Sequence, residues 1–125
     1  VMLLAGDYRI GAEGDFKIGL NEVAIGLPLP IFALELAKAR LDPRLLSEAT
    51  LLAQIYAPIH ALNTGYLDRV VDADQVIEAA MAKANELSNL QSAPFHATKI
   101  RLRQGTIDHI RATVEEDLQT LLPGA

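Results

Sequence analysis

The most apolar stretch of the chain, residues 18–34, carries its own helix and strand breakers. Gly26, Pro28 and Pro30 interrupt it, and Glu22 is its single charged residue. Proline cannot continue a helix or donate within a sheet, and a bilayer span needs about 20 consecutive apolar residues. The stretch is therefore expected to form short elements joined by turns, and neither one long helix nor a membrane span.

Short elements are predicted on both sides of this stretch. Residues 1–5 are uniformly apolar and fit either the buried end of a helix or a core strand. Residues 7–12 and 16–19 flank the turn signal at 13–15, which predicts two short strands around a turn. Apolar spacing and turn residues then predict helices from residue 31 to near 42, over 45–52 and over 56–64, and a strand over 66–71.

Helical periodicity dominates the remainder of the chain. Breakers and capping residues divide this part into separate helices. The predicted helices are residues 76–87, capped by Asp72 or Asp74; residues 92–103, ended by Gly105; and residues 107–121, capped by Thr106 and stopped by Pro123 and Gly124.

The composition excludes several classes of site and partner. The chain has no cysteine, so it can hold neither a disulfide nor a thiolate nucleophile, and it fits a reducing cytoplasm. A net charge of −5 without a long run of either sign argues against nucleic acid or an anionic membrane as the main partner. With 125 residues, half of them apolar, one globular unit is expected.

Two interpretations of Glu22 compete. A glutamate on a short turn is usually solvated, and it is almost never fully buried without a partner. Apolar neighbours such as Ile18, Leu20 and Val23 would instead make ionisation costly, and a carboxylate in such surroundings is basic enough to take a proton from a substrate carbon. Glu22 is therefore a general-base candidate.

Three segments occur in a distinctive order: GDYRIGAE at 6–13, IGLNEVAIGL at 18–27 and ALNTGYLDRVV at 61–71. They resemble three elements of the crotonase (enoyl-CoA hydratase/isomerase) superfamily. These elements are a strand ending in aspartate, a G-x-x-E-x-x-x-G element and an A-x-x-x-G-L-V-D-x-V strand. The resemblance implies an α/β fold, a spiral of strand–strand–helix turns. Residues 1–71 would form the second half of that spiral core, and residues 72–125 a helical region that builds a trimer.

On this resemblance Glu22 is the glutamate that acts as acid and base in hydratases and isomerases alike. The second glutamate of the hydratases falls on Val1, and the oxyanion-hole glycines fall ahead of it. Hydration uses two carboxylates, whereas moving a double bond from the 3,4 to the 2,3 position needs one base. The resemblance therefore favours a Δ3,Δ2-enoyl-CoA isomerase, with an enoyl-CoA hydratase or a catalytically silent assembly subunit as alternatives.

The resemblance also implies the ligands and partners. The substrate is an acyl-CoA thioester, no cofactor or metal is needed, and the assembly is a homotrimer or hexamer without nucleic acid or membrane. Lys99, Arg101 and Arg103 form a basic cluster. A solvated helix face is the favoured interpretation of this cluster, and binding of the CoA phosphates by Lys99 is the alternative.

The other polar residues receive no catalytic role. Asp7 is expected to act structurally, through hydrogen bonds. His60, His96 and His109 are too scattered in a helical chain to form a zinc site. Residues 27–30 stand where many hydratases have a glycine-rich helix start, and they are expected to line the acyl pocket instead.

Overall fold

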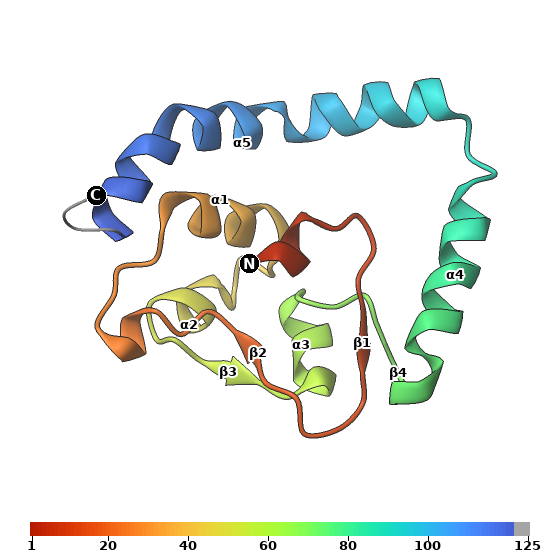
Figure 1. Cartoon of the computed structure of the whole chain (residues 1–125), viewed down its shortest axis with the longest axis horizontal. Helices are drawn as coiled ribbons and strands as arrows, with labels where there is room; N and C mark the ends of the chain where they lie inside the picture. Colours follow the sequence, from red (N-terminus) through yellow and green to blue (C-terminus); the bar gives the residue numbers. More distant parts are fainter. Residues whose placement is uncertain (122–125) are drawn as a thin grey trace.

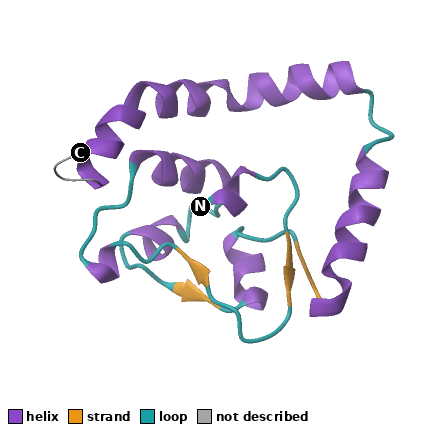
Figure 2. Ribbon diagram, viewed as in Figure 1, coloured by secondary structure: helices purple, strands orange, loops and turns teal. Residues whose placement is uncertain are grey.

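The computed structural model describes residues 1–121, with short strands in the first part of the chain and longer helices after residue 75. Figures 1 and 2 show α1 lying between the strands and the last helix, α5. The elements in chain order are η1 (Met2–Ala5), β1 (Ile10–Ala12), β2 (Ile18–Gly19), η2 (Val23–Ile25), α1 (Ile31–Arg40), α2 (Leu46–Thr50), β3 (Ile55–Tyr56), α3 (Pro58–Thr64), β4 (Arg69–Val71), η3 (Ala73–Gln75), α4 (Val76–Leu87) and α5 (Ser92–Leu121), where η marks a 3-10 helix.

The strands form two separate two-stranded sheets. β1 runs parallel to β4, and β2 runs antiparallel to β3. The two strands predicted around the turn at 13–15 are therefore present, but each pairs with a strand far along the chain and not with the other. Tyr56, predicted as the start of a helix, belongs to β3, and α3 begins two residues later with Pro58 in its first turn.

The core lies between α1, α2, α3 and the strands. α1 turns Ala33 and Ala37 inward, and both are completely buried, so neighbouring elements can approach its backbone closely. Gly65 ends α3 with a φ of +94°, as its position after the predicted helix required. The buried cluster consists of Leu4, Leu20, Ala37, Leu41, Ala49, Tyr56, Ala61, Tyr66 and Leu67.

Of the two alternatives left open for residues 1–5, the helix is present: Met2–Ala5 form a single turn of 3-10 helix, with Leu4 buried and Met2 91% exposed. The predicted cap of the helix at 76–87 is wrong. Neither Asp72 nor Asp74 caps α4 with its side chain, because a turn of 3-10 helix, η3, intervenes. The division of the chain between residues 71 and 72 stays a prediction.

α5 is one continuous helix, although Gly105 and Thr106 predicted a break. Glycine in a helix interior costs about 1 kcal/mol relative to alanine. Here α5 packs along α1, which offsets that cost. The predicted stop at 123–124 lies outside the described residues. Within residues 1–121 no helix is long and apolar enough to cross a membrane.

Hydrogen bonds anchor α5 at two places. The Asp7 carboxylate accepts hydrogen bonds from Lys99 and, at 2.7 Å, from Arg103, both on α5. Near the other end, the buried carboxylate of Asp117 accepts from the first two backbone N–H groups of α1, at 2.8 and 3.0 Å. Those N–H groups have no partner inside their own helix, and a negative charge there also complements the helix dipole. Asp117 thereby fixes where α1 begins.

The continuity of α5 can be tested at its glycine. A Cβ at Gly105 would meet no atom within 4 Å, so we expect Gly105→Ala to raise the free energy of unfolding by about 0.4–1 kcal/mol. The control is Gly65→Ala, which we expect to lower it by about 1 kcal/mol or more, because φ is positive and the new Cβ would lie 2.8 Å from the Arg40 carbonyl oxygen. Urea unfolding followed by circular dichroism measures both. A destabilising Gly105→Ala would contradict a continuous helix.

Candidate active site

Glu22 follows β2 and is the N-cap residue, directly before the single-turn helix η2. Its backbone carbonyl accepts hydrogen bonds from the N–H groups of Ile25, at 3.1 Å, and Leu27, at 2.9 Å. Gly26 takes a φ of +82°, which an L side chain rarely adopts, and ends the turn. Backbone hydrogen bonds and one glycine therefore fix the position of Glu22.

The Glu22 side chain is half-buried, and its Oε2 atom is fully buried. Among residues 1–121 nothing donates a hydrogen bond to this oxygen. Leu20 is buried nearby in sequence, whereas Val23 and Ile25 are exposed, so the predicted apolar surround is present only in part. Buried polar atoms are nearly always paired, so this unpartnered oxygen is placed to accept a proton or a hydrogen bond.

Tyr66 brings a second buried polar atom to this region. Its side chain is 2% exposed, and its ring packs on that of Tyr56 with centroids 5.8 Å apart. Burial raises the pKa of the Tyr66 hydroxyl far above its ordinary value, and nearby Tyr56 and Glu22 raise it further. The phenol therefore stays protonated. The sequence analysis gave Tyr66 no role. A signal was present, because tyrosine stands where the G-L-V-D pattern has leucine.

The hydroxyl of Tyr56, in contrast, has a partner. It donates a hydrogen bond of 2.9 Å to a carboxylate oxygen of Glu48. Burial, the hydrogen bond to Glu48 and the charge of Glu48 together raise the pKa of Tyr56 to about 12. Both residues line a cavity of about 330 Å³ beside His60. Of the two packed tyrosines, Tyr56 therefore has a hydrogen-bond partner for its hydroxyl.

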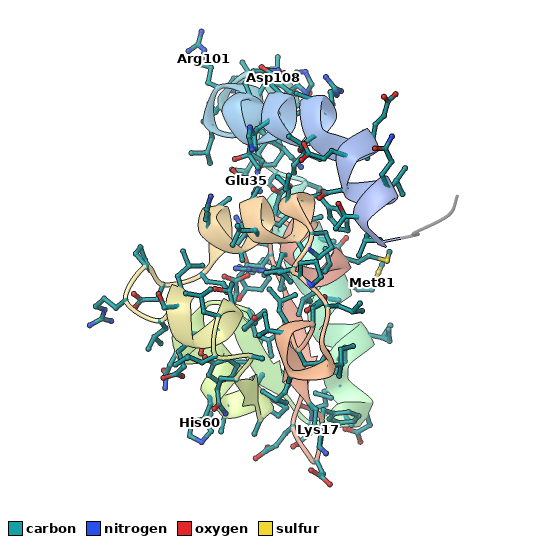
Figure 3. The ribbon with its side chains drawn as sticks, turned by 90° about the vertical axis from the view of Figure 1, so that its left-hand side faces the viewer. Lys17, Glu35, His60, Met81, Arg101 and Asp108 are labelled. Atoms are coloured by element: carbon teal, nitrogen blue, oxygen red, sulfur yellow. The ribbon has the colours of Figure 1, made fainter. Side chains whose placement is uncertain are left out.

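The basic cluster divides between two environments. Arg101 points away from the body of the protein, as Figure 3 shows, and fits a solvated helix face. Lys99 and Arg103 point inward to Asp7, which confirms the expected hydrogen-bonding role of Asp7. Burial alone would raise the pKa of Asp7, but its hydrogen bond with Lys99 and the positive charges around it hold that pKa below the ordinary value.

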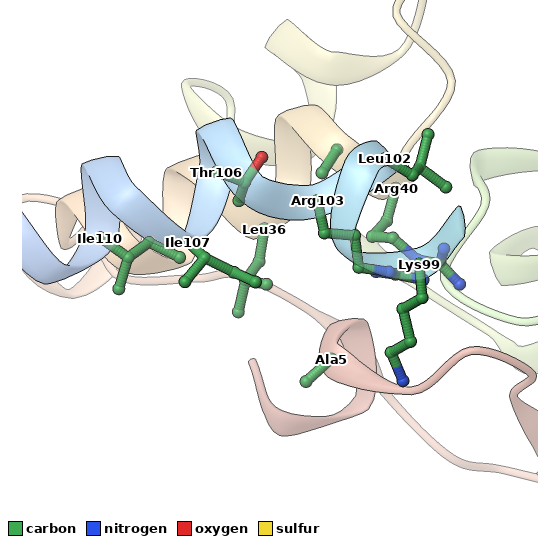
Figure 4. Close-up of a pocket in the computed structure, with 10 residues that line it drawn as sticks. Ala5, Leu36, Arg40, Lys99, Leu102, Arg103, Thr106, Ile107 and Ile110 are labelled. Atoms are coloured by element: carbon green, nitrogen blue, oxygen red, sulfur yellow. The ribbon is translucent and has the colours of Figure 1, made fainter. Parts of the chain in front are cut away.

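A cavity of about 430 Å³ lies between η1, α1 and α5 (Figure 4). Lys99, Arg103 and Arg40 form its polar part, and its other walls are mainly apolar, with Leu36 and Ile107 among them. Neither Glu22 nor any other carboxylate lines it. Because Lys99 and Arg103 are bound to Asp7 and no carboxylate lines the cavity, we place the candidate active site at Glu22 and not in this cavity.

The remaining candidates lie apart from Glu22. His60 is on α3, while His96 and His109 are on α5, more than three helical turns apart. Within the described part of the chain no three His, Asp or Glu side chains are placed to hold a metal ion. Residues 28–30, predicted to line an acyl pocket, line a cavity of about 150 Å³ against the end of α5.

Comparisons with known proteins agree over nearly the whole chain. The sequence model of the enoyl-CoA hydratase/isomerase family matches residues 1–122. The mitochondrial enoyl-CoA delta isomerase 1 of Rattus norvegicus is 30% identical over 120 residues, which are 95% of this chain and 42% of that protein. The chain thus spans less than half the length of this relative.

Solved structures match as well. An enoyl-CoA hydratase/isomerase family protein from Pseudomonas syringae superposes with a TM-score of 0.91 at 37% identity, covering 97% of this chain and 53% of that one. An enoyl-CoA hydratase from Mycobacterium ulcerans superposes with a TM-score of 0.86 at 34% identity, covering 93% and 52%. The similarity therefore extends to proteins described as isomerases and as hydratases.

Proposed function

The chain belongs to the enoyl-CoA hydratase/isomerase family, and from that premise we propose that it carries the acid/base residue of a Δ3,Δ2-enoyl-CoA isomerase, Glu22. Membership confirms the crotonase resemblance, and the structural matches confirm the predicted α/β fold class. Because the chain spans only part of its relatives, the activity proposed is that of the protein at its natural length.

In the proposed reaction the Glu22 carboxylate takes a proton from C2 of a 3-enoyl-CoA. The electron pair of that C–H bond moves toward the thioester carbonyl, whose oxygen becomes an enolate conjugated with the C3–C4 double bond. Glu22 then returns the proton to C4, and the double bond settles between C2 and C3. The observation that carries this proposal is the buried Oε2 atom of Glu22, which has no partner among residues 1–121.

The proposed reaction also requires hydrogen-bond donors that stabilise the negative charge on the enolate oxygen. Backbone N–H groups aimed at a developing oxyanion contribute about 3 kcal/mol each or more. This proposal assigns them to the part of the family fold that the chain does not span. Lys99, which pairs with Asp7 and is partly exposed, is proposed as a contact for the CoA phosphates.

One carboxylate favours isomerisation over hydration. Hydration requires a water molecule to be deprotonated while a proton is delivered to the neighbouring carbon, which two carboxylates do best. The position implied for the second glutamate holds Val1. Hydratase activity is the second candidate, favoured by the similarity to the Mycobacterium ulcerans enzyme.

Assembly into a homotrimer or hexamer is part of the proposal. The helical region leaves several large apolar side chains exposed, which favours a protein partner over solvent. They include Ile77 and Met81 on α4, and Leu102 and Leu118 on α5. A subunit that served only assembly would use the same surface without turning over substrate.

The test compares two reactions with the protein at its natural length. We expect 3-enoyl-CoA isomerisation to proceed with a higher kcat/KM than hydration of crotonyl-CoA. The isomerisation is followed by the absorbance of the conjugated 2-enoyl thioester, and hydration by its loss. Faster hydration would favour the hydratase alternative. Activity in neither assay would leave the assembly subunit as the better interpretation.

A further inference from the structure

Four buried side-chain polar atoms of the described residues have no hydrogen-bond partner: Glu22 Oε2, Arg40 Nε, Tyr66 Oη and Arg103 Nε. Both arginines bond through another guanidinium nitrogen, Arg40 to the Gly6 carbonyl and Arg103 to Asp7. The Tyr66 hydroxyl is the only polar group of its side chain. Glu22 and Tyr66 are therefore the two side chains whose unpaired atoms call for another explanation, because buried polar groups are nearly always paired.

The two atoms are chemically complementary. An ionised carboxylate oxygen only accepts hydrogen bonds, and a protonated phenol can donate one. The Tyr66 ring is fixed in the core by Tyr56, and Leu20, two residues before Glu22, belongs to the same buried cluster. Glu22 follows β2, which pairs with β3, and Tyr56 of β3 is the residue on which the Tyr66 ring packs.

We propose that Tyr66 is a positioning residue for Glu22: its hydroxyl donates a hydrogen bond to the Glu22 carboxylate through one bridging water molecule. This inference rests on the proposed function, in which Glu22 is the base. A base is effective only when the oxygen that takes the proton is held in line with the C–H bond. A hydrogen bond from a rigid side chain restricts the orientation of the carboxylate. Leucine, the residue of the pattern at this position, needs no partner, so the fold does not require the hydroxyl.

The variant Tyr66→Phe removes one oxygen and keeps the ring. We expect kcat to fall about tenfold, the size of effect that loss of one hydrogen bond to a charged group produces, with KM little changed. The acidic limb of the pH profile of kcat/KM should move to higher pH, because a carboxylate that loses a donor is harder to ionise. A purely structural role of Tyr66 would not move that limb.

Tyr56→Phe is the matched control, since it makes the same change in the neighbouring ring, whose hydroxyl bonds to Glu48. We expect it to lower the melting temperature and leave the pH profile unchanged. An infrared titration of the carboxylates gives a readout independent of turnover: only Tyr66→Phe should shift the band that Glu22→Gln removes.

The outcomes separate the two proposals. An unchanged pH profile and an unchanged infrared titration in Tyr66→Phe would overturn the role of Tyr66, while loss of activity in Glu22→Gln would leave Glu22 as the base. Full activity in Glu22→Gln would overturn the proposed function, and the positioning role of Tyr66 with it. A shift in Tyr56→Phe equal to that in Tyr66→Phe would mean that loosening of the core, and not the Tyr66 hydroxyl, is responsible.

Discussion

Glu22→Gln is expected to lower the rate of 3-enoyl-CoA isomerisation by about 10²- to 10⁴-fold, the contribution usual for a positioned acid/base group. Glutamine has nearly the shape of glutamate, but its amide cannot take a proton from a carbon acid at neutral pH. Because both proton transfers of the proposed reaction use the same carboxylate, its loss removes both steps. The loss should appear in kcat with little change in KM, since the carboxylate acts on the transition state.

The folded structure should tolerate this change. Among residues 1–121 no side chain donates to Glu22 Oε2, and backbone atoms, which the substitution does not touch, hold the turn. Circular dichroism and the melting temperature should match those of the wild type. The control is Glu35→Gln, which alters a carboxylate paired with Lys38 on α1 and should leave the rate within about twofold. Retained activity in Glu22→Gln would remove Glu22 as the base.

Helices with explicit end signals could be predicted from the sequence. Pro58 and Gly65 mark the two ends of α3, and Pro30 precedes α1, because these residues restrict the backbone locally. Gly105 misled the prediction for the opposite reason. Glycine is typical of a helix break, but packing of α5 along α1 outweighs the cost of a glycine inside a helix, about 1 kcal/mol. Local propensity cannot report a stabilisation that comes from another helix.

Strand pairing could not be predicted. β1 and β4 are short. They pair because residues 13–68 bring them together, and the local sequence pattern of those residues does not indicate which strands will meet. The two residues of the candidate site likewise differ in how far the sequence reveals them. Glu22 stands out as a lone charge in an apolar stretch, whereas Tyr66 has the character of an ordinary strand residue. Its importance comes from a missing hydrogen-bond partner, which only the three-dimensional arrangement reveals.

Asp68→Ala is expected to lower the free energy of unfolding by about 3 kcal/mol. Arg9 is 6% exposed, and its Nε and NH2 groups donate to the two carboxylate oxygens of Asp68 at 2.9 and 3.1 Å. The Arg9 backbone N–H also donates to Asp68, at 2.9 Å, and NH1 donates to the Gly65 carbonyl, at 2.8 Å. Removing the carboxylate leaves a buried guanidinium with one partner, and an uncompensated buried charge is strongly destabilising.

The exposed pair of Asp42 and Arg44 provides the control. Its closest contact, 2.7 Å, is shorter than those of the Arg9–Asp68 pair, but the Arg44 side chain is 85% exposed and water screens the attraction. We expect Arg44→Ala to change the free energy of unfolding very little. Urea unfolding at neutral pH compares the two variants. Equal losses would mean that burial does not set the strength of these pairs.

The Asp68 pair also predicts a dependence on pH. Burial alone would raise the pKa of Asp68, but the side-chain and backbone hydrogen bonds from Arg9 outweigh it and hold the pKa below its ordinary value. A carboxylate with a lowered folded-state pKa stabilises the protein fully above its unfolded pKa, about 3.9, and loses that contribution as pH falls through the folded value. The stability difference between wild type and Asp68→Ala should therefore be constant near neutral pH and shrink below about pH 4. A difference that stayed constant down to pH 2 would mean that Asp68 stabilises the fold without its charge, through packing or neutral hydrogen bonds.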